Sequence, residues 1–185
     1  MAAKSTLVNM VLCLGVTCLL CSAVLGFAYA VTKEPISEAA AVKTARSISQ
    51  VLPEFTSVEE ITDGDVTYFK AMADTALVGY AIRSTVVGFG GPLTLLVGVT
   101  ADGIVYNTSV LSHSETPGLG AKCTSDKKFM AQWQELNPSE KTLAVTKDGG
   151  SIDAITASTI TSRAYTKAVA NALEIYNTLG GQSNE

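Results

Sequence analysis

Charged residues and histidine are scarce in this chain of 185 residues. Charged residues make up 16% of the sequence, against roughly 25% in soluble domains, and none lies between Lys4 and Lys33. The formal net charge is −4, so there is no basic stripe for a phosphate backbone, and nucleic-acid binding is not expected. A single histidine and dispersed cysteines also argue against a zinc site, which needs clustered nitrogen and sulfur ligands.

Signatures of common catalytic sites are missing as well. The sequence has no Gly-x-x-x-x-Gly-Lys-Ser/Thr phosphate loop, no complete Gly-x-Gly-x-x-Gly, no Gly-x-Ser-x-Gly and no His-Glu-x-x-His. A Ser–His–Asp arrangement would have to use His113, and nothing near it in the sequence supports one. No independent catalytic activity is therefore expected.

A long apolar run without charge occupies residues 7–31. A helix needs about 20 residues to cross the hydrocarbon core, so this run is long enough to span a membrane. A cleaved signal peptide is the alternative, because Ala28-Tyr29-Ala30 matches a cleavage site, but its apolar region would be shorter. We expect a retained transmembrane helix at 7–31, preceded by a short cytoplasmic N-terminus at 1–6.

The orientation of this helix follows from what comes after it. Positive charges close to its two ends are nearly even in number, with Lys4 before it and Lys33 and Lys43 after it. All 17 acidic residues and 12 of the 13 basic residues lie from Lys33 onward. A single N-terminal anchor followed by a large acidic domain predicts that the domain is exported.

Three of the four cysteines, Cys13, Cys18 and Cys21, fall inside the expected span. Two interpretations stay open: they pack there as small apolar side chains, or they touch a neighbouring cofactor within the bilayer. Cys123 has no cysteine partner in the exported part, so no disulfide framework is expected.

After the expected transmembrane helix, the residue pattern indicates a linker at 32–64 and a domain at 65–185. Pro35 is suited to the first turn of a linker helix, which Pro53 ends, and a loop is expected over 54–65. Strand-like runs with an Ala101-Asp102-Gly103 hairpin turn follow, and helical spacing returns near the C-terminus. The expected strands are 66–69, 77–87, 93–99, 104–111 and 143–146, and the expected helices are 125–133, capped by Ser125, and 159–179. Strands in the middle with helices at the ends predict an α+β domain with an antiparallel sheet.

Two polar segments of the domain are candidates for a site. The stretch from His113 to Lys122 combines a proline, two glycines, a carboxylate and a lysine; it is either a surface turn or a loop that presents backbone donors to a ligand. Hydroxyl side chains gather between Asp153 and Ser162, where the last helix begins. They serve either as helix caps or as part of a phosphate site at the helix N-terminus.

Three motifs together resemble the flavin-binding domain of the G subunit of Rnf-type ion-translocating electron-transport complexes, a relative of the C subunit of sodium-translocating NADH:quinone reductase. They are, in chain order, Gly88-Phe89-Gly90-Gly91-Pro92-Leu93, then Glu115-Thr116-Pro117-Gly118-Leu119-Gly120 with Lys122, then Asp153-Ala154-Ile155-Thr156-Ala157-Ser158-Thr159. In the last motif Ala157 stands where the family usually has glycine and Ser158 where it has alanine, and Thr161-Ser162 matches the continuation.

The resemblance implies an electron-transfer subunit that carries FMN covalently, through a phosphoester to Thr159. It implies that the cofactor is bound by Glu115, Thr116, Pro117, Gly118, Leu119, Gly120, Lys122, Thr156, Ala157, Ser158, Ile160 and Thr161. A separate flavin transferase that uses FAD and Mg²⁺ would recognise Asp153, Thr156 and Thr159. The other partners would be membrane lipid and further subunits of a complex in the bacterial inner membrane, with the domain on the extracytoplasmic side. A membrane-anchored flavin sensor and a cofactor-free anchored binding module remain as alternatives.

Overall fold

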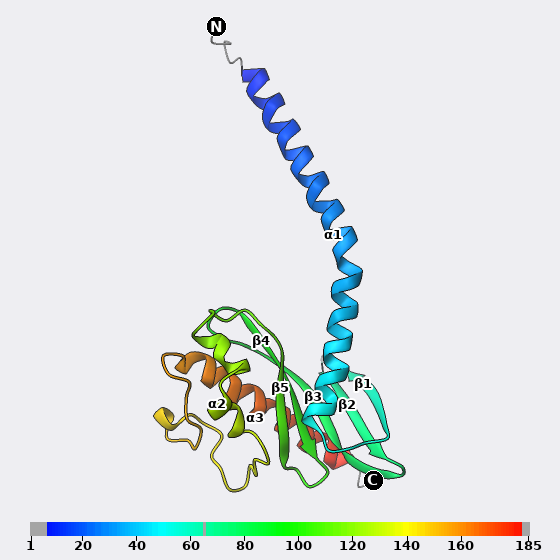
Figure 1. Cartoon of the computed structure of the whole chain (residues 1–185), viewed down its shortest axis with the longest axis vertical. Coiled ribbons are helices and arrows are strands. Elements are labelled where there is room, and N and C mark those ends of the chain that lie inside the picture. Colours follow the sequence, from blue (N-terminus) through cyan, green and yellow to red (C-terminus); the bar gives the residue numbers. More distant parts are fainter. Residues whose placement is uncertain (1–6, 65, 183–185) are drawn as a thin grey trace. The chain divides into compact units, whose positions relative to one another are not determined.

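The computed structural model describes residues 7–64 and 66–182, and the chain divides into two compact units between residues 42 and 43. The elements are α1 (Leu7–Val51), β1 (Ser57–Asp63), β2 (Val66–Ala73), β3 (Ala76–Val87), β4 (Pro92–Thr100), β5 (Val105–His113), η1 (Gly120–Thr124), α2 (Lys127–Ala131), η2 (Thr146–Asp148) and α3 (Thr159–Gln182) (Figure 1). The predicted architecture, a long apolar helix followed by an antiparallel sheet with flanking helices, is confirmed.

Helix α1 is the one helix in the described part of the chain that is long and apolar enough to cross a membrane, judged by length and composition. Its most apolar 18-residue window has a mean hydropathy of 2.4. The prediction that Pro35 opens a separate helix is wrong, because α1 runs through Pro35 without interruption. A proline inside a helix removes one backbone hydrogen bond. Here the residues on both sides of Pro35 stay helical, so the helix continues through it.

The sheet is an antiparallel meander in the order β1-β2-β3-β4-β5. The expected loop over 54–65 is wrong over residues 57–63, because β1 pairs with β2, with Ile61 opposite Tyr68. Six of the seven β1 residues are exposed, so the strand has no buried alternation that the sequence could reveal. Charged residues such as Glu59 and Glu60 suit an edge strand, where they discourage pairing with another chain.

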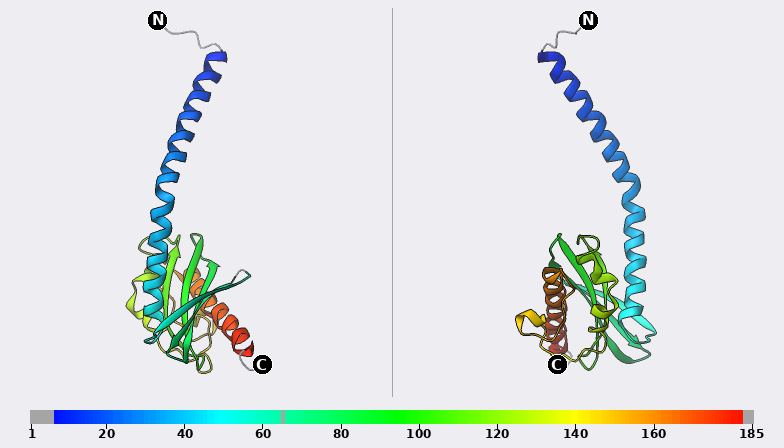
Figure 2. Two further views of the ribbon diagram at one scale, coloured as in Figure 1. Left: turned by 90° about the vertical axis from the view of Figure 1, so that its right-hand side faces the viewer. Right: turned by 60° about the vertical axis from the view of Figure 1, so that its left-hand side comes forward.

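Helix α3 covers one face of this sheet (Figure 2). Its apolar stripe matches the prediction: Tyr165, Val169 and Ala172 are fully buried, and Tyr176 is partly buried against the same cluster. The sheet supplies alternate residues to this core, among them Leu93, Leu95, Val97 and Val99 of β4, and Trp133 packs into it from the segment after α2. Because α3 packs against this face of the sheet, the sheet fixes the position of the N-terminus of α3.

The last turns of α1 lie on the opposite face of the sheet. Ile48 and Val51 pack there with Phe69 and Leu96. A Cβ at Gly98 would collide with the carbonyl oxygen of Val51, so glycine allows the helix end to reach the strand backbone. The domain therefore has three layers, made of the end of α1, the sheet and α3.

The segment between β5 and α3 is mostly irregular. The predicted strand at 143–146 is wrong: the described residues form only an isolated parallel bridge between Val145 and Ile152, followed by η2. None of the described strands pairs with this segment, and its hydrogen bonds, such as the one from the Thr146 amide to the Ile152 carbonyl, are local. The cap of α2 is also corrected, because the side chain of Asp126, not Ser125, accepts from the amides of Lys128 and Phe129.

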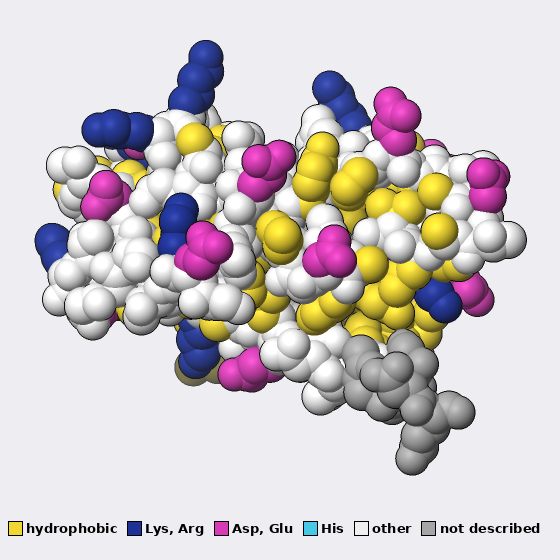
Figure 3. Space-filling view, turned by 90° about the horizontal axis from the view of Figure 1, so that it is seen from below, with side chains coloured by type: hydrophobic (Ala, Val, Ile, Leu, Met, Phe, Trp, Pro, Cys, Tyr) yellow, Lys and Arg dark blue, Asp and Glu magenta, His cyan; other side chains and the backbone are white. Residues whose placement is uncertain are grey.

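Charges of both signs are interspersed on the face of the molecule seen from below (Figure 3). Figure 3 shows acidic and basic side chains alternating over the face seen from below, with apolar patches between them. No single-sign field that would attract a polyanion lies on this face.

Candidate functional site

A cavity of about 330 Å³ lies where the loop after β3, the segment after β5 and the start of α3 meet. This volume is within the usual range for sites that hold a small molecule or cofactor. Three of its apolar lining side chains are exposed, namely Phe89, Leu119 and Ile160. The cavity is lined by Phe89, Glu115, Thr116, Leu119, Gly120, Ala157, Ser158, Thr159, Ile160 and Thr161.

Glu115 joins the three segments that form this cavity. Its side chain is 5% exposed, with Oε1 accepting from the amide of Phe89 at 2.8 Å and Oε2 accepting from the hydroxyl of Thr161 at 2.8 Å. A Cβ at Gly88 or at Gly120 would collide with the carboxylate of Glu115, so both glycines make room for it. The carboxylate thus holds the walls of the cavity together, and the Thr161 hydroxyl is engaged with it.

The floor of the cavity includes the N-terminus of α3. The chain turns into the helix through Ala157, which has a positive φ of 61°. The first intrahelical bond is donated by the amide of Ser162 to the carbonyl of Ser158, at 3.0 Å. The amides of residues 159–161 precede it and have no intrahelical acceptor, and they lie at the positive end of the helix dipole. This end of the cavity favours an anion.

Ser158 has a side chain that needs a partner. Ser158 is 6% exposed, yet its Oγ makes no hydrogen bond with any described residue. Its backbone is fully engaged, with the amide donating to Ile155 and the carbonyl accepting from the Ser162 amide and hydroxyl. A buried hydroxyl without a partner is unfavourable by roughly 1–3 kcal/mol, so a polar ligand group at this place would stabilise it.

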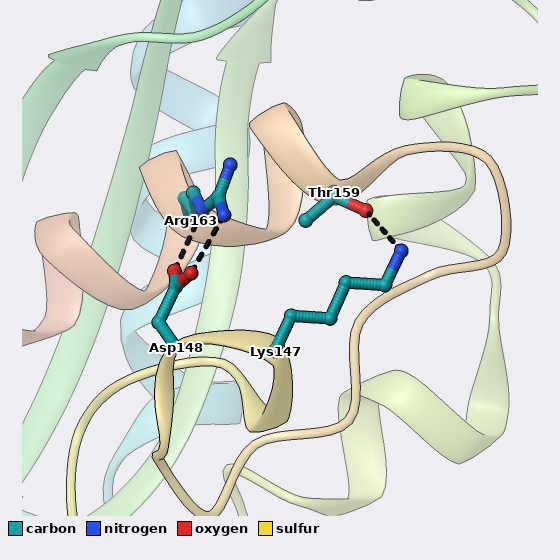
Figure 4. A network of polar contacts seen from close by, with 4 residues as sticks. All are labelled: Lys147, Asp148, Thr159 and Arg163. Atoms are coloured by element: carbon teal, nitrogen blue, oxygen red, sulfur yellow. Dashed lines mark hydrogen bonds and ion pairs between the residues drawn. The ribbon is translucent and has the colours of Figure 1, made fainter.

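Thr159 and a lysine lie beside this helix start. The Nζ of Lys147 donates to Oγ1 of Thr159 at 3.3 Å (Figure 4). The next residue, Asp148, forms a two-pronged ion pair with Arg163, with both N–O distances at 2.6 Å. This hydrogen-bonded pair lowers the pKa of Asp148 and raises the pKa of Arg163. Sequence reasoning missed Lys147, since only the turn that follows it, Asp148-Gly149, carries a recognisable signal.

Some of the expected site residues lie elsewhere. Pro117, Gly118 and Lys122 do not line the first cavity. Asp153 and Thr156 line a second cavity, of about 360 Å³, and not the first. Its full lining is Asp126, Lys128, Phe129, Gln132, Asp153, Ala154, Ile155 and Thr156. The side chain of Gln132 brackets the backbone of Asp153, accepting from its amide at 2.7 Å and donating to its carbonyl at 3.2 Å.

Cys123 is a buried neighbour of the site and is not a reactive group. The side chain is fully buried, and burial, helped by the negative charge of Glu115, raises the pKa of the thiol to about 11. The thiol therefore stays protonated at neutral pH, and a protonated thiol is a poor nucleophile. Beside it, the hydroxyl of Tyr165 is hydrogen-bonded to Thr108 at 2.7 Å within an aromatic cluster with Phe129 and Trp133.

Comparison with known proteins agrees with this geometry. The family model of the FMN-binding domain matches residues 88–174, which contain the whole lining of the first cavity. The chain is 31% identical over 169 residues to the G subunit of the proton-translocating ferredoxin:NAD(+) oxidoreductase complex of Clostridium ljungdahlii, covering 91% of this chain and 90% of that one. It is 36% identical to the G subunit of the ion-translocating oxidoreductase complex of Erwinia tasmaniensis, covering 83% and 81%. The chain therefore belongs to the family of G subunits of ion-translocating oxidoreductase complexes.

Solved structures share the fold. The C subunit of the Na(+)-translocating NADH-quinone reductase of Parabacteroides distasonis superposes with a TM-score of 0.51 at 22% identity, over 74% of this chain and 81% of that one. NqrC of Shewanella oneidensis gives a TM-score of 0.50 at 18% identity, over 72% of each chain. At these sequence identities the similarity supports a shared fold and nothing further.

The residues of the first cavity fit a flavin mononucleotide. The unpartnered Ser158 hydroxyl and the helix N-terminus suit a phosphate, and the Lys147 ammonium, outside the lining, donates to the Thr159 hydroxyl beside them. The exposed side chains of Phe89, Leu119 and Ile160 suit an apolar ring.

Proposed function

We propose that this chain is the electron-relay subunit of a membrane-bound ion-translocating oxidoreductase complex, and that it carries FMN on Thr159 through a phosphoester. The observation that carries the proposal is the cavity that joins the Thr159 hydroxyl, the start of α3 and an apolar rim. When bound, FMN supplies the redox chemistry, because a flavin accepts and releases electrons singly or in pairs.

The phosphate end of the cofactor would be held at the start of α3. The free amides of residues 159–161 and the Ser158 hydroxyl supply donors there. The Thr161 hydroxyl contributes indirectly: it donates to Glu115, which satisfies that carboxylate and keeps it bound to the cavity wall. Glu115 thus acts as a brace between the walls.

The ring end would rest on the apolar rim of the cavity. Phe89, Leu119 and Ile160 are 66%, 44% and 52% exposed, and their burial by a flat ring removes apolar surface from water. They come from three separate segments, so the ring would bridge the loop after β3, the segment after β5 and α3.

Attachment would require a flavin transferase that uses FAD and Mg²⁺. Thr159 contributes its hydroxyl oxygen to a new P–O bond with the FMN phosphorus. The P–O bond of the FAD anhydride breaks, AMP leaves, and the hydroxyl proton passes to a base of the transferase. Asp153 and Thr156, which line the second cavity together, are the residues we assign to recognition by this enzyme.

Helix α1 supports a single-pass anchor in the bacterial inner membrane, in contact with lipid over its apolar part. The acidic domain that follows would lie on the extracytoplasmic side, beside the other subunits of the complex. A covalent link prevents loss of the cofactor there, where no cytoplasmic pool can replace it.

The test is production of the full chain together with its flavin transferase, followed by denaturation and intact mass measurement. The wild-type chain should gain the mass of one esterified FMN, and Thr159→Ala should gain none while its thermal unfolding stays cooperative. Thr178→Ala, a change of the same kind on the exposed face of α3, should be loaded like the wild type. A flavin that remains on denatured Thr159→Ala would refute the assignment.

A further inference from the structure

We propose that Lys147 is the cation that binds the phosphoryl group at residue 159, both while the ester forms and afterwards. The inference rests on the proposed function and deepens it, since it adds a residue that no part of the sequence motif contains.

Lys147 lies beside the hydroxyl group that would be esterified. The Nζ of Lys147 lies 3.3 Å from Oγ1 of Thr159, the oxygen that would enter the P–O bond. An ammonium that donates to this oxygen stabilises the negative charge that develops on it as the hydroxyl proton leaves. The phosphodiester that results keeps one negative charge, and the same ammonium is then within reach of its oxygens.

The segment that holds Lys147 is fastened to the helix it serves. Asp148 is bound to Arg163 of α3 by two contacts of 2.6 Å, so η2 is tied to the same helix that carries Thr159 (Figure 4). The amide of Thr146 donates to the carbonyl of Ile152 at 2.8 Å, which closes the loop from the other side. A backbone fixed on both sides of the lysine reduces the conformational freedom lost when its ammonium binds an anion.

An independent observation also points to an anion at this place. The Oγ of Ser158, next to Thr159 in the chain, is buried and makes no hydrogen bond with any described residue. A phosphate oxygen would satisfy this hydroxyl together with the amides that begin α3. Neither Lys122 nor Lys147 lines the cavity itself, but Lys147 donates a hydrogen bond to the Thr159 hydroxyl, so it is the lysine placed to act on a group attached there.

The test compares Lys147→Gln, Lys147→Arg and the matched control Lys141→Gln, an exposed lysine of the same loop, in the full chain. The first readout is the initial rate of flavin incorporation by the transferase, followed by intact mass. Loss of one partly exposed charged hydrogen bond should slow Lys147→Gln about fivefold to tenfold. Lys147→Arg should stay within about twofold, since it keeps the charge, and Lys141→Gln should match the wild type.

The second readout is the phosphorus-31 resonance of purified, fully loaded protein, which does not depend on the transferase. Lys147→Gln should shift this resonance and reduce its response to added NaCl, whereas Lys141→Gln should leave both unchanged. Slower incorporation with an unchanged resonance would mean that Lys147 only contacts the transferase, and this would overturn the inference. A wild-type rate for Lys147→Gln would overturn it as well. If the wild-type chain itself takes up no flavin, the proposed function fails, and that result is seen before any variant is compared.

Discussion

Residues 153–156 line the second cavity and residues 157–161 line the first, and the two cavities differ in the side chains that line them. The first cavity combines exposed apolar side chains with a helix N-terminus and the Thr159 hydroxyl. The second is lined by the polar side chains of Asp126, Lys128, Gln132 and Asp153 around Phe129. One short motif therefore contributes to two cavities. The residues in the first cavity are suited to bind a cofactor, and those in the second are suited to be recognised by another protein.

The boundary between the two surfaces is a backbone feature. Ala157 adopts a positive φ of 61°, and the residues before it line the second cavity while Ala157 and the residues after it line the first. The Cβ of alanine disfavours this left-handed conformation, so the chain keeps the turn at some expense in strain. Substitutions that change one of the two surfaces should therefore leave the other unchanged.

The largest effect is expected from Glu115→Ala, which removes the brace of the first cavity. The Phe89 amide and the Thr161 hydroxyl would lose their shared acceptor, so we expect the free energy of unfolding to fall by roughly 2–3 kcal/mol. Chemical denaturation measures this loss, and flavin loading should fall with it. Glu174→Ala, an exposed glutamate on α3, should change stability by less than about 0.5 kcal/mol. Equal stability of the two variants would show that Glu115 does not hold the walls together.

Asp153→Asn changes only the second cavity. Its carboxylate accepts no hydrogen bond from the described residues, so the free energy of unfolding should stay within about 0.5 kcal/mol of the wild type. We expect flavin incorporation to slow about tenfold, a difference of about 1.4 kcal/mol, because the transferase would lose a charged contact. Intact mass over time measures the rate, with Asp74→Asn in the β2–β3 turn as a control of equal charge change. A wild-type rate of flavin incorporation would show that the transferase does not recognise the Asp153 carboxylate.

Ala157→Gly tests the turn between the cavities. Glycine accepts a positive φ without strain, although it has more freedom in the unfolded chain, so a net gain of about 0.5–1 kcal/mol in unfolding free energy is expected. Ala154→Gly is the matched control; residue 154 is not among the described residues with positive φ, so this change should destabilise by about 0.4–1 kcal/mol. Thermal melts of both variants decide the matter. If Ala157→Gly lowers the free energy of unfolding, the inference that Ala157 is strained is wrong.

The smallest effect concerns the ion pair beside the first cavity. The hydrogen bonds from Arg163 lower the pKa of Asp148 below its ordinary 3.8, so the pair stabilises the folded loop at pH values above 3.8. This contribution is lost as the pH falls through the lowered pKa. In a carbon-13 titration the Asp148 carboxyl should change below pH 3.8, and Arg163→Gln should return its midpoint to the ordinary value. A midpoint at or above 3.8 in the wild type would show that the pair does not persist in solution.

Local elements of the fold were predictable because their signals are local. The apolar run from Leu7, the hairpin at Asp102-Gly103 and the stripe of α3 with Tyr165 and Val169 each follow from composition or spacing within a few residues. The predictions were wrong where pairing with a neighbouring strand decides the structure. β1 is exposed at six of its seven residues and is a strand because it pairs with β2, whereas residues 143–146 pair with none of the described strands.

For the candidate site, the sequence by itself determined which motifs the chain carries and that hydroxyl groups gather where α3 begins. Only the tertiary structure decided that Glu115 meets Thr161 across 46 positions, that Lys147 reaches Thr159 across 12, and that Asp153 and Thr159 face different cavities. The reason is physical: a hydrogen bond between distant segments depends on the path of the backbone between them. That path is set by strand pairing and by helix packing on the sheet, which no short stretch of sequence contains.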